Sequence, residues 1–473
     1  MHQTKLIRLL KTFSAWEIRA FDDFVHSPFF NKNPSVTHLW ELTKSEFPTF
    51  DQPVLERKNM FAKVFPGEVF DEQKLRYLMT DLTRLMESFW VYRFRENDST
   101  RYQMDLMDVF SHKDLTKDRE ESASRLRKTL EKQPIKKTSD LLQKFLFEEN
   151  EYLSQPHARD RRHTSPVNEV MDSLDAFYLA KKLRYSCEIV NRANILQQEA
   201  RLFLTPQILQ QIESFPVKDF PLIHLYHTTL LTLTDGANEN HYFTLRQQLE
   251  NSLQILDKEE LNHLYSFALN YAIKQFNTGK AAFGKEIFDL YKTLIENRII
   301  FEGDQLPVPH FKNMVAIGTR LKEFEWVESF IENYQKYLPE SDRFNAYTYN
   351  LAYLLFEKKA YNRVLRMLSS VEFSDVFYQT DAKTVLLRTY YELEDFDGLT
   401  YLMGSFRMFL RRDKQLSDYQ RKLYLNLIKV AQMLMRYRLG ENITVAQIKT
   451  HIEKTPDIAG LNWVKAKIAE LEQ

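Results

Sequence analysis

The chain has 473 residues, of which 44% are hydrophobic and 14% aromatic, and its 65 basic and 65 acidic side chains cancel to a net charge of zero. This length suits two or three ordinary domains or one elongated array of repeats, and the apolar content excludes a disordered chain. A net charge of zero gives no overall field that would draw the chain to nucleic acid or to an anionic membrane.

Glycine and cysteine are both scarce. The chain has 10 glycines, where average usage of roughly 7% would give about 33. Strand-rich and nucleotide-binding folds need glycine in turns and phosphate loops, so the shortage predicts helices joined by short polar turns. A single cysteine, Cys187, excludes an intramolecular disulfide framework and fits a reducing compartment. Because the N-terminus lacks the apolar core of a signal peptide and no apolar run reaches membrane-spanning length, we expect a cytoplasmic protein.

Residues 1–110 are predicted to form a compact N-terminal helical unit. Ser14 and Glu17 make a capping box, which marks the start of a helix. A second, strongly amphipathic helix is expected over roughly Glu72–Phe94, because apolar residues recur there at three- and four-residue spacing. Its stripe consists of Leu75, Leu78, Met79, Leu82, Leu85, Met86, Phe89 and Trp90. We interpret the stripe as core packing, and a partner-binding groove is the alternative.

Residues 111–300 are expected to hold helical hairpins around a long central helix. Two helices are predicted between Asp114 and Tyr152, before a charged, proline-bounded stretch at Ser154–Pro166. That stretch is typical of a solvated loop, with a nucleic-acid contact as the alternative. The long helix is expected over about Val167–Leu204, and Cys187 lies in its apolar stripe, where a packed thiol is favoured over a reactive one.

The strongest repeat lies between Asn345 and Met403. Two helical hairpins align there at an offset of 35 residues, and each has a charged turn that is closed by an aromatic residue, Tyr361 or Phe396. An earlier hairpin at His310–Pro339 carries Phe324 at the same place. The final helix, predicted at Leu461–Leu471, would cover the open end of the row with four apolar residues: Trp463, Val464, Ile468 and Leu471.

Residues 310–405 resemble tetratricopeptide repeats (TPR), two-helix units of about 34 residues. Tyr349–Ala352 is similar to the first-helix signature of the family, and Phe356 and Tyr361 match its aromatic positions. The chain departs from the pattern where the second helix should carry a small residue, at Val327, Val364 and Leu399. It also departs where the turn should carry glycine, at Lys322, Lys359 and Glu394. The bulkier residues are expected to push the paired helices apart.

This resemblance implies an all-α fold. Residues 301–473 would form a right-handed α-solenoid of antiparallel, TPR-like hairpins with C-terminal capping helices, preceded by the N-terminal helical unit. In the family, the inner helices line a concave groove that holds an extended peptide or a partner helix. The positions that would face this groove are Lys312, Arg320, Tyr349, Tyr353, Phe356, Arg388 and Tyr391. Some members grip a C-terminal carboxylate with a lysine–asparagine clamp, but only Lys312 and Asn350 fit its positions, so we do not expect one here.

No catalytic, cofactor or metal site is expected. The chain has no Gly-rich phosphate loop, and one cysteine cannot provide a Cys–Cys metal pair. His224 and His227 lie three residues apart without a zinc signature around them. Four acidic residues cluster at one hairpin turn, namely Glu392, Glu394, Asp395 and Asp397, and we interpret them as a solvated turn.

One charged stretch stands out, at residues 401–440. Its basic residues are Arg407, Arg411, Arg412, Lys414, Arg421, Lys422, Lys429, Arg436 and Arg438. Only Asp413 and Asp418 oppose them, and aromatic residues interleave with the positive charge. We favour a basic face that docks on acidic surface, in this chain or in a partner. The leading hypothesis is therefore a non-enzymatic protein–protein interaction scaffold, and nucleic-acid binding through this basic face is the alternative.

Overall fold

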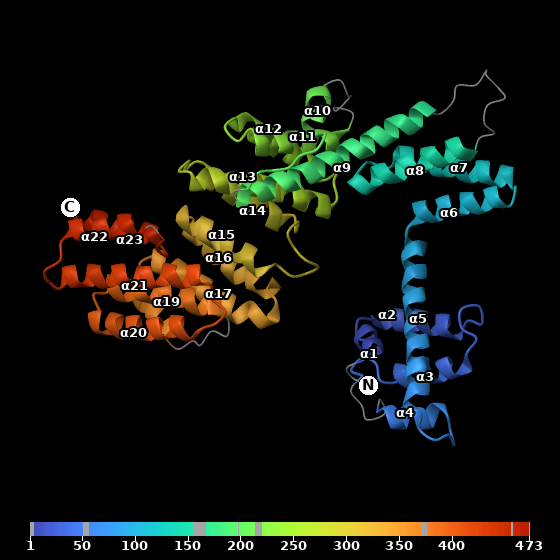
Figure 1. The fold of residues 1–473 in the computed structure, drawn as a ribbon, viewed down its shortest axis with the longest axis horizontal. Coiled ribbons are helices and arrows are strands. Elements are labelled where there is room, and N and C mark those ends of the chain that lie inside the picture. The colour runs from blue at the N-terminus through green and yellow to red at the C-terminus, as the bar shows by residue number, and fades with distance from the viewer. Residues whose placement is uncertain are drawn as a thin grey trace. The chain divides into compact units, whose positions relative to one another are not determined.

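The structure is a computed structural model, and it describes residues 4–50, 56–154, 167–196, 198–212, 220–369, 376–455 and 457–472. Within these ranges the fold has 23 α-helices and no β-strand, which confirms the all-α prediction (Figure 1). None of the helices in these ranges combines the length and apolar character needed to cross a membrane.

The helices pack into two compact units. The first comprises Met1–Pro134 and Ser139–Phe177, and the second comprises Ile135–Thr138 and Tyr178–Gln473. The predicted division into 1–110, 111–300 and 301–473 stays a prediction.

The first unit begins with five helices around one aromatic core. They are α1 (Lys5–Leu10), α2 (Ala15–His26), α3 (Pro34–Lys44), α4 (Arg57–Val64) and α5 (Glu72–Asn97). The Ser14 hydroxyl accepts from the Glu17 N–H at 3.2 Å, and the Glu17 carboxylate accepts from the Ser14 N–H at 2.7 Å, so the predicted capping box is confirmed. The rings of Phe21, Trp40 and Phe89 pack edge to face or tilted at the centre.

The apolar stripe of α5 is largely buried in this core, which confirms the core-packing interpretation. The first unit continues with α6 (Ser99–His112), α7 (Thr116–Lys132), α8 (Thr138–Ser154) and the first part of α9 (Val167–Leu196). A smaller apolar cluster around Met107 and Phe147 joins α6, α7 and α8. The predicted loop at Ser154–Pro166 lies, beyond Ser154 itself, outside the described residues.

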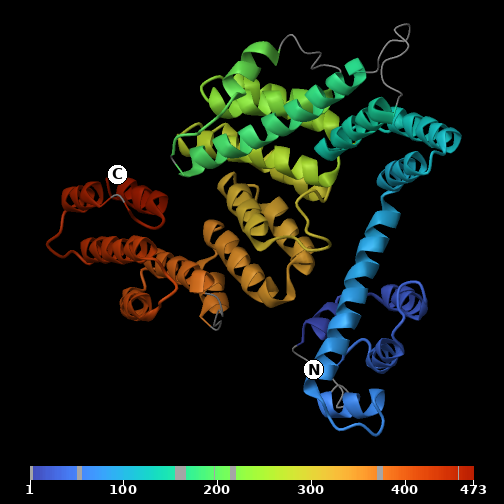
Figure 2. The ribbon, with the colours of Figure 1, turned by 45° about the vertical axis from the view of Figure 1, so that its right-hand side comes forward.

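The second unit continues α9 and holds the remaining helices (Figure 1, Figure 2). They are α10 (Thr205–Gln211), α11 (Pro221–Thr234), α12 (Glu239–Ser252), α13 (Lys258–Asn277), α14 (Phe283–Glu296), α15 (Val308–Arg320), α16 (Phe324–Tyr334), the 3₁₀-helix η4 (Gln335–Tyr337), α17 (Glu340–Glu357), α18 (Tyr361–Leu368), α19 (Val376–Glu392), α20 (Phe396–Arg412), α21 (Asp418–Arg438), α22 (Val445–Lys454) and α23 (Leu461–Leu471).

The central helix is shorter than predicted. α9 ends at Leu196 instead of continuing to Leu204, and the N–H of Gln198 bonds to the carbonyl of Ala193 at 2.9 Å, which closes the helix end. Cys187 on this helix is fully buried, so the prediction of a packed thiol is confirmed.

A buried carboxylate fastens the short segment Ile135–Thr138 within the second unit. Glu260 on α13 accepts from the backbone N–H of Thr138 at 3.1 Å and from the guanidinium of Arg184 at 3.3 Å. The Tyr226 hydroxyl also donates to it. Because Glu260 is almost completely buried, these three donors replace the water that its charge would otherwise require.

The helices from α15 onward pack in a regular order. α15 packs against α16, α17 against α18, and α19 against α20, while α15, α17, α19 and α21 also contact one another in sequence. The first helices of successive hairpins therefore form one continuous row. This packing is compatible with a helical repeat.

The three hairpin turns share one backbone geometry. Lys322, Lys359 and Glu394 stand where the repeat pattern expects glycine, and their φ angles are 65°, 60° and 56°. In each turn, the residue after the left-handed one donates its N–H to the carbonyl five residues earlier, which is the hydrogen bond of a Schellman motif. In the first hairpin, Glu323 donates to Gly318 at 3.0 Å. The left-handed turn is thus kept without glycine.

The first helix crossing has room for its bulky residue because the facing position is a glycine. Val327, Val364 and Leu399 are all fully buried at the positions where the repeat pattern expects a small side chain. In the first hairpin, a Cβ placed on Gly318 would lie 2.6 Å from Cγ2 of Val327. The missing side chain at Gly318 therefore provides the room that Val327 occupies.

Candidate binding cleft

A cleft of about 990 Å³ opens among the last helices of the second unit. Its walls come from α15, α17, α19, α21 and the segment Ala459–Glu470, which includes α23. Six of the seven predicted groove residues line it, namely Lys312, Arg320, Tyr349, Tyr353, Phe356 and Arg388. We call this site the C-terminal cleft.

Aromatic rings make up one wall of the C-terminal cleft. Tyr349 and Tyr353 stack with ring centroids 6.4 Å apart, and Nζ of Lys312 lies 5.1 Å from the Tyr349 ring. Lys312 is ion-paired with Asp381 on α19, so its charge is already neutralised.

The other predicted groove residues differ in accessibility. Phe356 is buried and its ring packs 5.5 Å from Tyr361, so it lines the base of the cleft. The guanidinium of Arg320 lies 4.1 Å from the centre of the Phe276 ring at the rim. Tyr391 does not line the cleft; it is buried behind it, with its ring 5.4 Å from that of Trp463.

Helix α23 also lines the cleft, although its sequence predicted only a cover for the open end of the row. The indole N–H of Trp463 donates to Glu392 at 2.8 Å, and Nζ of Lys467 donates to the same carboxylate at 2.9 Å. Lys467 also pairs with Glu470 on its own helix. Glu392 therefore joins α19 to α23.

The interpretation of Glu392 as part of a solvated turn is wrong. Its side chain is only 14% exposed, because α23 covers it, and its partner Lys467 is 10% exposed. Burial alone would lower the pKa of Lys467, but the hydrogen bonds to Glu392 and Glu470 outweigh it and raise that pKa. Trp463 and Lys467 are four residues apart on a helix, which signals a shared face, but no local pattern shows which acid they meet.

Arg388 is the most unusual group in the C-terminal cleft. Its Nε is shielded from solvent, and the side chain has no hydrogen bond or ion pair with any of the described residues. The guanidinium lies 5.8 Å from the Trp463 ring, and a Cβ placed on Gly460 would lie 1.6 Å from its Nη2. Glycine at position 460, with a φ of 67°, therefore provides the space that Arg388 fills.

Several pKa values around Arg388 are shifted by burial. Burial raises the pKa of Tyr349 well above its usual range, and it also raises the pKa of Tyr353. Partial desolvation raises the pKa of Glu357 as well, against the opposing effect of Arg388, although the residue keeps an exposed surface. Both tyrosines therefore remain protonated at neutral pH and act as hydrogen-bond donors. Shifted groups that gather in a cleft are typical of a functional site.

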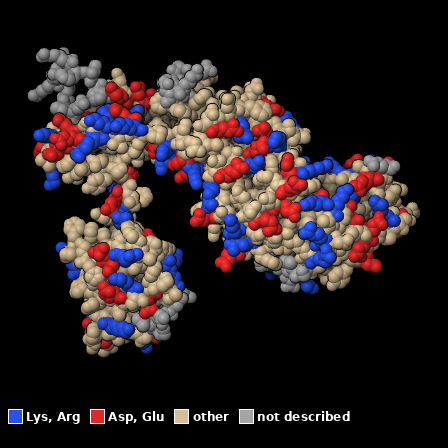
Figure 3. All heavy atoms as spheres, turned by 180° about the vertical axis from the view of Figure 1, so that it is seen from behind, with Lys and Arg blue, Asp and Glu red and all other residues tan. Residues whose placement is uncertain are grey.

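The basic face at 401–440 is neutralised only in part by contacts within the chain. Figure 3 shows basic and acidic side chains interspersed over the surface in view. Four of its basic residues have partners outside the α20–α21 loop. Arg407 donates to Gln432, Lys422 pairs with Asp457, Arg436 with Glu441, and Arg438 lies 3.6 Å from Glu394.

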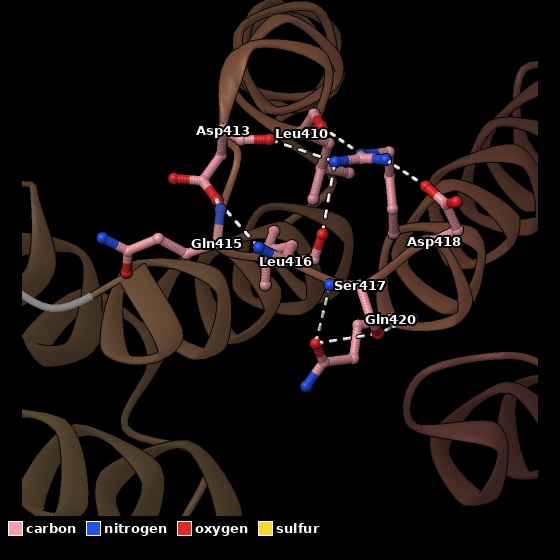
Figure 4. Close-up of polar contacts among 8 residues, drawn as sticks. Leu410, Asp413, Gln415, Leu416, Ser417, Asp418 and Gln420 are labelled. Atoms are coloured by element: carbon pink, nitrogen blue, oxygen red, sulfur yellow. Dashed lines mark hydrogen bonds and ion pairs between the residues drawn. The ribbon is translucent and has the colours of Figure 1, made fainter.

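Arg421 has a structural role in the loop between α20 and α21 (Figure 4). Its guanidinium donates to the carbonyls of Leu410 at 2.7 Å, Asp413 at 3.0 Å and Leu416 at 3.3 Å, and it pairs with Asp418. These bonds satisfy carbonyls at the end of α20 and in the loop that follows.

Arg411, Arg412, Lys414 and Lys429 remain exposed, with no partner among the described residues. Four of the nine predicted basic residues are ion-paired within the chain, which reduces the positive charge that this surface offers to a phosphate backbone. Nucleic-acid binding stays a prediction that these pairings do not favour.

Among the described residues, one group of three side chains has the spacing of metal ligands: Asp22, His26 and Glu41. Its groups already bond one another or their neighbours. Nε2 of His26 lies 3.0 Å from Glu41, while Asp22 accepts from Lys44 at 2.6 Å and from the Trp40 indole at 2.8 Å. The arrangement is a surface ion cluster that links α2 to α3.

Comparisons of the chain with protein-family models, with curated proteins and with solved structures yield no match.

Proposed function

We propose that the protein is a cytoplasmic, non-enzymatic scaffold that binds a peptide or partner helix in the C-terminal cleft. In this proposal, residues 301–473 form a right-handed, TPR-like α-solenoid of antiparallel hairpins, closed at its end by α23. The observation that carries the proposal is that six groove positions, chosen by resemblance to a repeat family, line one cleft.

The packing order and the turns support the repeat assignment. The row α15, α17, α19 and α21 places the first helix of each hairpin on a common face, which is where a solenoid presents its binding surface. The three Schellman turns at 322, 359 and 394 repeat at the offsets of the hairpins.

The chemistry of the lining suits binding rather than a reaction. Tyr349 and Tyr353 offer flat, amphipathic rings, and Arg388 offers a charged donor; these are the side-chain types that dominate protein interfaces. Burial keeps both hydroxyls protonated, so neither tyrosine supplies a base at neutral pH. The single, buried cysteine agrees with a reducing compartment.

The test is a selection of short random peptides against the full-length protein, followed by titration of a selected peptide. Tyr353→Ala is expected to weaken binding by about tenfold or more, because an interface aromatic typically contributes over 1.4 kcal/mol. Tyr401→Ala is the matched control, since Tyr401 lies on α20 outside the cleft and is 81% exposed. If both variants bind like the wild type, or no peptide is enriched, the proposed site is wrong.

A further inference from the structure

The charge of Arg388 is not matched by a contact in the C-terminal cleft. The nearby carboxylates of Glu357 and Asp381 act on it only through space, since neither makes an ion pair with it. A partly desolvated guanidinium without a partner is energetically unfavourable. A carboxylate would correct this, because its two oxygens match the planar fork of the guanidinium.

Two further donors line the same cleft as Arg388. Tyr349 and Tyr353 line the same cleft and act electrostatically on Arg388, and neither hydroxyl has a hydrogen-bond partner among the described residues. The other cations of the inner cleft are occupied, Lys312 by Asp381 and Lys467 by Glu392 and Glu470. The unused hydrogen-bonding capacity of the floor is therefore concentrated around one cation and two hydroxyls.

The acidic side chains of the C-terminal cleft leave Arg388 available. Asp381 is paired with Lys312, and Glu392 and Glu470 are paired with Lys467, while Glu357 makes no ion pair with Arg388. A single carboxylate is enough to match the one guanidinium of the inner cleft that has no partner among the described residues. The rings of Tyr349, Tyr353 and Trp463 line the cleft together with Arg388 and offer apolar contacts to a bound segment. This combination fits an isolated acidic side chain with apolar neighbours.

We propose that the C-terminal cleft recognises a peptide segment with one aspartate or glutamate between apolar residues, and that Arg388, helped by the Tyr349 and Tyr353 hydroxyls, binds its carboxylate. This specificity rests on the proposed function of the cleft. It differs from a clamp for a terminal carboxylate, because the anchor is a single arginine on α19.

The test uses a peptide selected against the full-length wild type and an analogue in which its acidic residue is replaced by glutamine. The wild type is expected to bind the acidic peptide about 10- to 100-fold more tightly than the analogue, since hydrogen bonds to charged groups contribute roughly 1.5–3 kcal/mol. Arg388→Gln should remove this preference, so that both peptides bind equally. Arg363→Gln, the same change of charge on an exposed position of α18, should preserve it.

A second variant keeps the test decisive if Arg388→Gln fails to fold. Glu357→Gln removes a negative charge that acts on Arg388, so it should tighten binding of the acidic peptide severalfold and leave the glutamine analogue unchanged. Circular dichroism checks the fold of each variant.

Each outcome separates the two proposals. A selected peptide without an acidic position, or an acidic preference that persists in Arg388→Gln, overturns this inference and leaves the peptide-binding function standing. Tighter binding of an oligo(dT) strand than of any peptide also overturns it. If no peptide is enriched at all, the proposed function fails together with this inference.

Discussion

Glu392 provides the sharpest test of how α23 is held against the second unit. Its carboxylate accepts from the Trp463 indole at 2.8 Å and from Lys467 at 2.9 Å, and both charged side chains are mostly buried. Removing one partner of a fully buried pair costs about 3–5 kcal/mol. Lys467 keeps Glu470 as a partner, so we expect Glu392→Ala to cost less, about 2–3 kcal/mol. Glu392→Gln keeps an acceptor for the indole, and we expect about half that cost.

Hydrogen exchange read by mass spectrometry measures this loss locally. The amides of Leu461–Leu471 should exchange roughly 30- to 160-fold faster in Glu392→Ala, since each 1.4 kcal/mol is a factor of about ten. Glu394→Gln is the matched control, because Glu394 is 64% exposed and lies 3.6 Å from Arg438, a geometry that contributes little. Unchanged protection of α23 in Glu392→Ala would refute the idea that Glu392 anchors this helix.

Two further predictions concern the hairpin turns and the buried tyrosines. Lys359→Gly should stabilise the protein by about 0.5–1 kcal/mol in urea unfolding. Lys359 has a left-handed φ of 60°, which glycine adopts without strain, and this gain exceeds the loss from the greater entropy that glycine gives the unfolded chain. Lys358→Gly, at an ordinary φ of −73° and with loss of the pair to Glu328, should destabilise it; equal effects would contradict the turn argument. Burial raises the pKa of Tyr265 to about 12, and it raises those of Tyr226 and Tyr242 further. Because their folded-state pKa is raised, these tyrosines favour the folded state as long as their hydroxyls are neutral. Their contribution to the free energy of unfolding is fully present below the unfolded tyrosine pKa of about 10. Above that pH it falls by roughly 1.4 kcal/mol per tyrosine for each pH unit, until the pH reaches the folded-state pKa. In mild denaturant, the protein should unfold between about pH 10 and 12, and the tyrosinate absorbance of the buried tyrosines should rise together with unfolding. If these tyrosines ionise well before the protein unfolds, the assignment of their stabilising role is wrong.

Local rules account for much of what the sequence predicted correctly. The capping box at Ser14 and Glu17 and the apolar stripe of α5 depend only on neighbours along the chain, and both are found in the structure. The sequence did not predict that α9 ends at Leu196. The residues around this end are polar and carry no pattern that shows which of them ends the helical hydrogen bonding.

Contacts between distant residues explain what the sequence could not predict. The resemblance to a repeat family predicted that Arg388 faces the groove. Whether Arg388 has a partner depends on where α17 and α23 place their carboxylates, which the sequence does not show. The partners of Glu392 lie on α23, 71 and 75 residues further along the chain, and no spacing rule connects them. The pairing of Lys312 with Asp381, 69 residues apart, has the same origin.

The Glu260 site has a practical bearing on how the chain can be divided for experiments. A fragment that starts at Tyr178 would keep Arg184 and Tyr226 but lose the amide of Thr138, and a buried anion would then be short of one donor. Such a fragment should express less well than one that retains the four residues Ile135–Thr138, whatever is removed before them. Dissection at the obvious point, in the middle of α9, would therefore give a misleading picture of how well the C-terminal half folds alone.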